Sequence, residues 1–440
     1  MKTMKKSHFR TIISLTLSVL LSTAFVCGND IQKTYTWKYN ISSDASVTME
    51  NYDCNIIIHT WDKGEAEFRL TIDAETKSDE DAAILEKHLQ DLKFSTSPAA
   101  VSFSNRFWES RTTIMNRTTM KLDGGKTVTL TSMELRGELW IPAGCKFELD
   151  SKYSSVQMED FAGPLKLDLY NDNFTGGKIS SRAVINDKYG TMVFGDMKDF
   201  SADLYNSHFN AGNTGDVTFE SKYSSVTLAS CGKLSANAYN DKYEITKTGD
   251  VTFTAKYSDL KTESSGNVNI NTYEGKVSMK EVMDLKIASK YAEYLVSLAG
   301  RCSISSSYND KLAFGKLTSL IIDESKYTVF RIGYLAESLE GRDGYNDNFT
   351  ISDTGKEFKG LNLNGKYITA VVTLSGSTAF RFKAEIKYAD LDINESSFKP
   401  IVKVIDGSDV KYDAIKGTES PGMPVIEING YEMALKILEK

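Results

Sequence analysis

The amino-acid sequence predicts an all-β protein: a right-handed parallel β-helix (β-solenoid) with rungs of about 17–18 residues, and one short amphipathic helix near the N-terminus. Three observations predict this fold. A tyrosine returns at a nearly constant interval, short runs alternate apolar with polar residues, and Gly, Asn, Asp and Ser separate these runs.

The tyrosine repeat organises most of the chain after residue 150. Successive tyrosines are 16 to 22 residues apart over fourteen units, a regularity that indicates a repeat architecture. The fourteen tyrosines are Tyr153, Tyr170, Tyr189, Tyr205, Tyr223, Tyr239, Tyr257, Tyr273, Tyr291, Tyr308, Tyr327, Tyr345, Tyr367 and Tyr388.

The units fall into two alternating classes. One reads Lys-Tyr with an apolar residue three positions later, as at Lys222-Tyr223-Ser224-Ser225-Val226. The other reads Tyr-Asn-Asp with its apolar anchor four positions after the tyrosine, as at Tyr239-Asn240-Asp241-Lys242-Tyr243. Because Asn and Asp favour tight corners and left-handed backbone, we interpret the extra residue as a bulged corner in every second rung.

Runs such as Val251-Thr252-Phe253 alternate with a period of two and end at Gly-containing corners such as Thr248-Gly249, which is a β-strand signal. About eighteen residues per unit leave no room for a crossover helix, so the units are expected to stack as coils about 4.8 Å apart. Parallel crossovers are right-handed by default.

The same period-two pattern predicts where each tyrosine points. In the Lys-Tyr class, Tyr257 shares parity with Val251 and Phe253, so these tyrosines are predicted to lie in the core. In the Tyr-Asn-Asp class the preceding residue takes the inner face, which leaves one exposed aromatic in every second rung. The candidate binding residues are therefore Tyr170, Asn171, Tyr205, Asn206, Tyr239 and Asn240. The alternative is that these tyrosines only cover the strand corners and stack on one another.

The flanks differ from the repeats. We expect residues 29–150 to form a β-rich N-terminal capping region containing a helix at 78–92, with Ser78 as its N-cap. Residues 151–396 form the predicted solenoid. Residues 397–440 keep the β alternation without the repeat tyrosine and are interpreted as a C-terminal β cap, because an open solenoid end exposes core and strand edges.

Residues 1–28 have the pattern of a secretory signal peptide. Lys2, Lys5, Lys6 and Arg10 precede an apolar stretch of about fifteen residues, which is too short to be a transmembrane helix. Cleavage after Ala24 or Gly28 fits the pattern; alternatively, Cys27 is the lipidated first residue of a lipoprotein, the one route by which we expect contact with a membrane. The protein is therefore expected to be exported, to the periplasm, the outer-membrane surface or the extracellular space. The widely spaced Cys54, Cys145, Cys231 and Cys302 do not resemble a disulfide framework.

The remaining signals disfavour several kinds of chemistry. A net charge of -7, with no basic block after the signal, disfavours nucleic acid as a partner. The three scattered histidines after residue 28 and the absence of phosphate, dinucleotide or nucleophile motifs predict no metal, no cofactor and no catalytic residue. The repeated Asp172, Asp241, Asp310 and Asp347 are interpreted as corner residues, with catalytic acids on one face of a carbohydrate-active β-helix as the alternative. Calcium binding by the same residues is a weaker alternative.

Several segments in this order carry a family resemblance: His59-Thr60-Trp61-Asp62-Lys63, the helix at 78–92, the Leu139–Gly144 entry and the Lys-Tyr-Ser-Ser-Val rungs. With them the chain resembles the bacterial putative-adhesin families, exported β-solenoid domains of unassigned role that are compared with the heads of autotransporter adhesins. The resemblance implies an envelope or surface location and carries over no catalytic residue; there is no recognisable translocator barrel.

These observations lead to one expected function, a purely structural or assembly role close to it, and one alternative of a different class. The expected function is a non-catalytic, adhesin-like envelope or surface protein that presents a repetitive face to glycan or protein partners. The alternative is a carbohydrate-active lyase or hydrolase, which would need acids that break the repeat rather than follow it.

Overall fold

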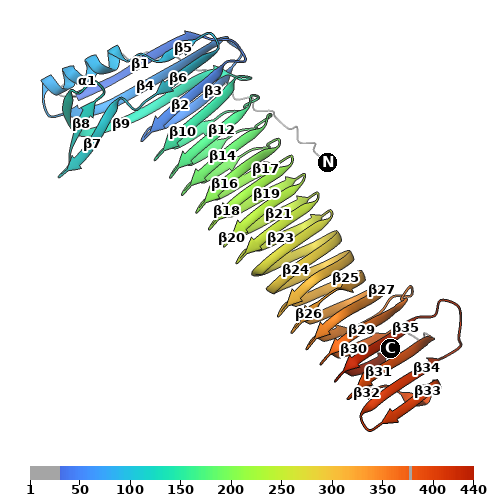
Figure 1. The fold of residues 1–440 in the computed structure, drawn as a ribbon. Coiled ribbons are helices and arrows are strands. Elements are labelled where there is room, and N and C mark those ends of the chain that lie inside the picture. The colour runs from blue at the N-terminus through green and yellow to red at the C-terminus, as the bar shows by residue number, and fades with distance from the viewer. Residues whose placement is uncertain (1–29, 376–378) are drawn as a thin grey trace, which may run out of the picture. The chain divides into compact units, whose positions relative to one another are not determined.

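A computed structural model describes residues 30–375 and 379–440 (Figure 1). The expected signal peptide and Cys27 lie outside these residues. Within them, no helix is both long and apolar enough to span a bilayer. The chain divides into two compact units. The described part of the N-terminal unit comprises residues 30–33, 73–90 and 108–133, and the solenoid unit comprises 34–72, 91–107 and the described residues from 134 onward.

The N-terminal unit contains α1 (Asp79–Asp91), the hairpin of β7 (Trp108–Ile114) and β8 (Arg117–Leu122), and the first part of β9 (Thr127–Pro142). The helix begins as predicted, because the Ser78 hydroxyl accepts a hydrogen bond from the Asp81 N–H at 3.2 Å. Its buried residues are Ala82, Leu85 and Leu89.

The solenoid unit confirms the predicted β-solenoid, with about 13 turns and a spacing of about 18 residues. Each rung places one strand before and one strand after a sharp corner, and both pair in parallel with their equivalents in the next rung (Figure 1). A third, shorter contact joins Phe161, Ile179, Met197 and Thr214 of successive rungs. Consecutive coils therefore form the parallel stack that the repeat predicts.

The bounds of the remaining elements follow in three groups. The N-terminal strands are β1 (Asp30–Asn40), β4 (Glu65–Thr76), β5 (Ser95–Ser97) and β6 (Ala100–Ser104). The strands before and after the corner in the first rungs are β2 (Ser46–Tyr52), β3 (Asn55–Trp61), β10 (Lys146–Lys152), β11 (Ser155–Met158), β12 (Leu165–Tyr170), β13 (Asn173–Gly176), β14 (Ala183–Lys188), β15 (Thr191–Phe194), β16 (Phe200–Tyr205), β17 (His208–Asn213), β18 (Val217–Lys222), β19 (Ser225–Cys231), β20 (Leu234–Tyr239), β21 (Lys242–Thr248), β22 (Val251–Lys256) and β23 (Asp259–Ser265). The later elements are β24 (Val268–Tyr308), β25 (Lys311–Ile322), β26 (Ser325–Lys326), β27 (Val329–Tyr345), β28 (Asn348–Ile351), β29 (Gly360–Lys366), β30 (Thr369–Leu374), β31 (Phe380–Lys387), β32 (Asp390–Asp392), the 3-10 turn η1 (Glu395–Ser397), β33 (Phe398–Asp406), β34 (Asp409–Lys416), β35 (Val425–Tyr431) and β36 (Ala434–Glu439).

The core is a continuous apolar column inside the coils. Alternate residues of each strand point inward, as Val251, Phe253 and Ala255 do, all at most 4% exposed. Burial raises the pKa of the Cys54, Cys145 and Cys231 thiols to about 12, and Cys302 is buried as well. All four cysteines are free, so the core is held by packing and strand pairing.

Candidate functional site

The outer surface at the corners carries one continuous column of tyrosines, one in every rung. Neighbouring rings meet edge to face, with centroids 5.2–5.8 Å apart and planes at 71–81°. The tyrosine column consists, in spatial order, of Tyr52, Tyr153, Tyr170, Tyr189, Tyr205, Tyr223, Tyr239, Tyr257, Tyr273, Tyr291, Tyr308, Tyr327, Tyr345, Tyr367, Tyr431 and Tyr388.

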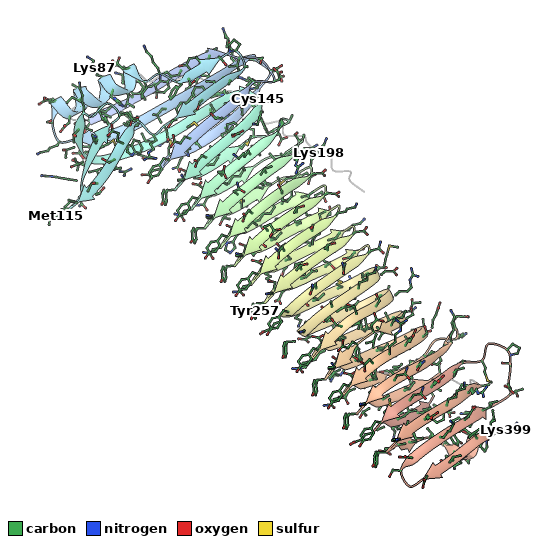
Figure 2. The ribbon with its side chains drawn as sticks, in the orientation of Figure 1. Lys87, Met115, Cys145, Lys198, Tyr257 and Lys399 are labelled. Atoms are coloured by element: carbon green, nitrogen blue, oxygen red, sulfur yellow. The ribbon has the colours of Figure 1, made fainter. Side chains whose placement is uncertain are left out.

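The prediction that the Lys-Tyr tyrosines lie in the core is wrong. Tyr223 is 45% exposed and Tyr257 43%, slightly more than Tyr239 of the other class at 38%. Figure 2 shows Tyr257 at the edge of the stack. The reason is the backbone: Tyr223 and Tyr257 have φ of 57° and 56°, so the period-two alternation ends one residue before them.

The prediction of a bulged corner in every second rung is also wrong. Lys152 pairs with Tyr170 and Ser155 with Asn173, so both classes have corners of equal length. What differs is the place of the tyrosine. In one class it is the left-handed corner residue; in the other it is the last strand residue, and Asn171 takes the left-handed position with φ of 55°.

Two adjacent surface positions therefore alternate along the stack. The strand-end position holds Lys, then Tyr, then Lys, while the corner position holds Tyr, then mostly Asn, then Tyr. The lysines were not predicted to be part of this surface, although the Lys-Tyr pattern is visible in the sequence. The reason is that the period-two alternation placed the tyrosines next to them in the core. The strand-end lysines are Lys152, Lys188, Lys222, Lys256, Lys290, Lys326, Lys366 and Lys387.

The structure places the six candidate binding residues on this one surface. Tyr205 is 37% exposed and Tyr239 38%, Tyr170 is half-buried, and Asn171, Asn206 and Asn240 are exposed corner residues with positive φ. They are members of a longer column that includes the Lys-Tyr tyrosines between them. Whether they bind a partner stays a prediction.

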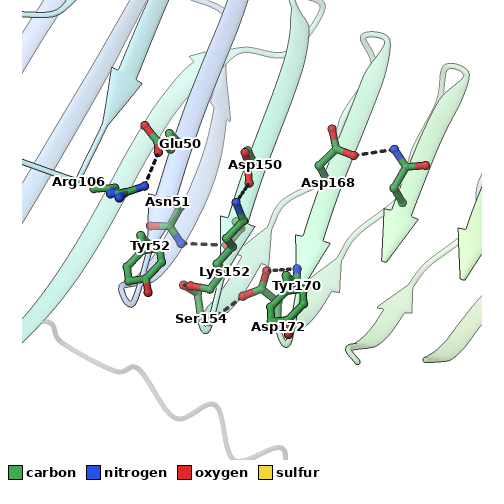
Figure 3. A network of polar contacts seen from close by, with 12 residues as sticks. Glu50, Asn51, Tyr52, Arg106, Asp150, Lys152, Ser154, Asp168, Tyr170 and Asp172 are labelled. Carbon is green, nitrogen blue, oxygen red and sulfur yellow. Dashed lines mark hydrogen bonds and ion pairs between the residues drawn. The ribbon is translucent and has the colours of Figure 1, made fainter. Parts of the chain in front are cut away.

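Behind the tyrosines, an inner column of Asp, Ser and Thr side chains holds the corners together. The Asp241 carboxylate accepts hydrogen bonds from the backbone N–H of Ser224 at 2.6 Å and of Tyr239 at 2.8 Å, and from the Ser221 hydroxyl at 2.8 Å. Asp172 makes the equivalent contacts to the N–H groups of Ser154 and Tyr170 (Figure 3). Each such carboxylate thus ties its own corner to the preceding rung.

These repeated carboxylates are buried. Asp172, Asp241, Asp310 and Asp347 are at most 5% exposed. Burial raises the pKa of Asp172 and of Asp347 to about 6, and raises the pKa of Asp241 and Asp310, against the opposing effect of the N–H donors. The predicted structural role of these aspartates at the corners is therefore confirmed, because their oxygens accept hydrogen bonds from corner backbone N–H groups.

A second group of acidic side chains lies on the edge of the rungs away from Tyr257, where Figure 2 labels Lys198. A surface hollow there is lined in part by Arg182, Lys198, Asp199 and Asp216. Both acids follow the repeat, and each accepts a backbone N–H from the next rung: Asp199 from Asp216 at 2.9 Å, and Asp216 from Lys233 at 2.8 Å. In the part of the chain that the structure describes, no group of three or more His, Cys, Asp or Glu side chains is arranged to hold a metal ion.

Comparison with known proteins adds little to this description. No family model matches the sequence, and none of the curated proteins matches it. The chain is similar to a crystal structure described as a "putative cell adhesion protein" from Clostridium sporogenes, at 9% identity over 93% of this chain and 100% of that chain, with a TM-score of 0.16. A likeness at this level carries no functional inference.

Proposed function

We propose that this chain is a non-catalytic, adhesin-like protein of the cell envelope or surface that binds extended glycan or protein partners along the tyrosine column. The observation that carries the proposal is the column itself. It repeats an exposed or half-buried aromatic ring in every rung, beside outward-pointing lysines and asparagines. The family resemblance of the sequence and its signal-like N-terminus support the proposed location.

The column has the physical properties of a binding surface. Tyrosine offers a large apolar ring and a hydroxyl, a combination suited to contact with sugar rings or with another protein. Each ring is held edge to face by two neighbours, so little side-chain entropy is lost when a partner docks. Lys222 and Asn240, beside Tyr223 and Tyr239, supply hydrogen-bond donors of the kind that fix a polar partner in register.

The alternative function is a carbohydrate-active enzyme. It would use two or more exposed acids in one groove. One hollow of this kind contains Asp199 and Asp216, although both carboxylates already accept backbone N–H groups. Another is lined by Glu385, Asp406 and Asp409. An assay for new reducing ends or unsaturated products from a polysaccharide panel distinguishes the two functions. Activity lost in Asp199→Asn and Asp216→Asn would favour the enzyme.

The binding proposal is tested with purified residues 29–440 on an array of glycans and envelope proteins. Beside the wild type, one variant carries Tyr170→Ala, Tyr205→Ala and Tyr239→Ala, and a matched control carries Phe at the same positions. We expect saturable binding that the alanine variant loses and the phenylalanine variant largely keeps, with circular dichroism showing that both are folded. Binding that is equal in all three proteins, or absent from all of them, would reject the column as the working surface.

A further inference from the structure

One rung of the solenoid is supplied out of sequence order. β35 lies between β29 and β31 and runs parallel to both, and β36 lies between β30 and β32 (Figure 1). Residues 425–439, here called the clasp segment, therefore lie between two rungs that come earlier in the sequence. We call the space between these two rungs the slot. Seven residue pairs join β35 to each neighbouring strand.

The clasp segment has the strand-end tyrosine and the left-handed corner of a regular rung, with the buried Met433 in place of the corner carboxylate. Tyr431 occupies the strand-end position opposite Lys366 and Lys387, and Glu432 takes the left-handed corner position with φ of 51°. The Tyr431 ring meets Tyr367 at 5.8 Å and Tyr388 at 5.2 Å. The clasp segment therefore continues the tyrosine column without a break.

With this rung in place, the two classes of unit alternate without a break. Lys366-Tyr367 and Lys387-Tyr388 are consecutive Lys-Tyr units in the sequence, and without the clasp segment two units of the same class would be neighbours. Tyr431-Glu432 belongs to the other class and matches Tyr273-Glu274. The slot therefore holds a rung of the class that keeps the alternation.

The clasp segment is held by the two rungs on either side of it. The inward-facing Ile426, Ile428, Met433 and Leu435 are at most 2% exposed, and the backbone of β35 is paired on both edges. The preceding connection, residues 417–424, is different: most of it is exposed, and Gly417 and Gly422 have φ of 76° and 78°.

We infer that the slot is a binding site for a β-rung, and that a second copy of this chain can fill it with its own clasp segment. A clasp segment from a second chain would make the same strand pairs and bury the same side chains, so only the connection distinguishes the closed monomer from a reciprocal, two-fold exchanged dimer. In the monomer the connection keeps the segment at a high effective concentration, which favours the closed form in dilute solution. A connection too short to reach the slot of its own chain shifts the balance to the dimer.

The slot is tested first in the full chain. A protease site replaces residues 418–421, and the native protein is cleaved there. We expect the fragment to stay bound and then to exchange with a labelled peptide of residues 423–440. A control peptide with Ile426→Asp and Ile428→Asp should bind at least about 100-fold more weakly, because it buries two charges in the core. If the cleaved fragment never exchanges under any native condition, or if both peptides bind alike, the inference is overturned.

The second chain as partner is tested by the length of the connection. Lys416 and Val425 lie on either side of β31, about 10 Å apart. Deletion of residues 417–423 leaves one residue between them, and two Cα steps reach at most about 7 Å. This deletion should therefore give a folded dimer by light scattering, while a matched insertion of seven Gly and Ser residues at the same place should leave the chain monomeric. Adding Ile426→Asp should prevent the exchanged dimer from forming, because a charge at this buried position weakens docking of the clasp segment in the slot. A shortened chain that is folded and monomeric would contradict the inference.

Discussion

The ring of Tyr223 packs edge to face against that of Tyr239 at 5.6 Å and 79°, although the two residues occupy different positions in their rungs. Tyr223 is the left-handed corner residue of one rung, and Tyr239 is the last strand residue of the next. The alternation of these two positions is what brings one tyrosine per rung to a single exposed column.

Removing one ring from the column should cost stability. Tyr239→Ala loses edge-to-face contacts with Tyr223 and Tyr257, each worth about 0.5–1.5 kcal/mol, so the free energy of unfolding should fall by about 1–3 kcal/mol. Urea unfolding followed by circular dichroism measures this loss. Tyr239→Phe keeps the ring and serves as the control; an equal loss in the phenylalanine variant would mean that the hydroxyl, not the stacking, matters.

The corner backbone predicts a different response at Asn240. This residue has φ of 57°, a conformation that alanine adopts at a cost of roughly 1–2 kcal/mol and glycine adopts freely. Asn240→Ala should therefore lower the free energy of unfolding by about 1 kcal/mol, while Asn240→Gly changes it little. At most positions alanine is better tolerated than glycine, so a glycine variant that is more stable than the alanine variant would be diagnostic. An alanine variant with the higher free energy of unfolding would refute the left-handed corner assignment of Asn240.

Loss of an inner carboxylate should be more severe. Asp241→Ala leaves the buried N–H of Ser224 and the partly buried N–H of Tyr239 without this acceptor. An unsatisfied buried N–H costs about 1–3 kcal/mol, and the Ser221 hydroxyl loses its bond to the same carboxylate. We expect a loss of at least about 2 kcal/mol in the free energy of unfolding. The same change at the exposed Asp203 is the matched control and should have almost no effect.

The buried acids also predict a pH dependence. Because burial raises the pKa of Asp172 from an ordinary 3.8 to about 6, the folded state holds a proton that the unfolded state releases between these values. Its contribution to stability is therefore complete below about pH 4 and is lost as the pH rises through about 6. Relative to Asp172→Asn, the wild type should lose about 2–3 kcal/mol of unfolding free energy between pH 4 and pH 6.5. Parallel pH profiles for the two proteins would show that Asp172 titrates normally.

The sequence predicted the solenoid because its signals are local: a tyrosine period near eighteen, and period-two strands such as Val251 to Ala255. The exposure of Tyr205 and Tyr239 followed from the same period-two alternation, whereas Tyr170 is half-buried. The exposure of Tyr223 and Tyr257 did not, because a tyrosine in the left-handed region is rare and resets the alternation.

The rung at Tyr431 was missed for another reason. Its neighbours, Tyr367 and Tyr388, are distant in sequence from it, and a reading in chain order assigned residues 397–440 to a cap without the repeat tyrosine. One signal was available: two Lys-Tyr units in succession break the alternation that holds elsewhere.

We propose that the tyrosine column is a repetitive binding surface rather than a single site. The most direct test is the dissociation constant of residues 29–440 for a bound glycan or repeat peptide, measured by calorimetry as a function of ligand length. A repetitive surface predicts that affinity rises steadily as the ligand spans more rungs, and that the Tyr170, Tyr205 and Tyr239 alanine variant flattens the rise. An affinity that does not depend on length, or a rise that the variant leaves unchanged, would contradict the claim.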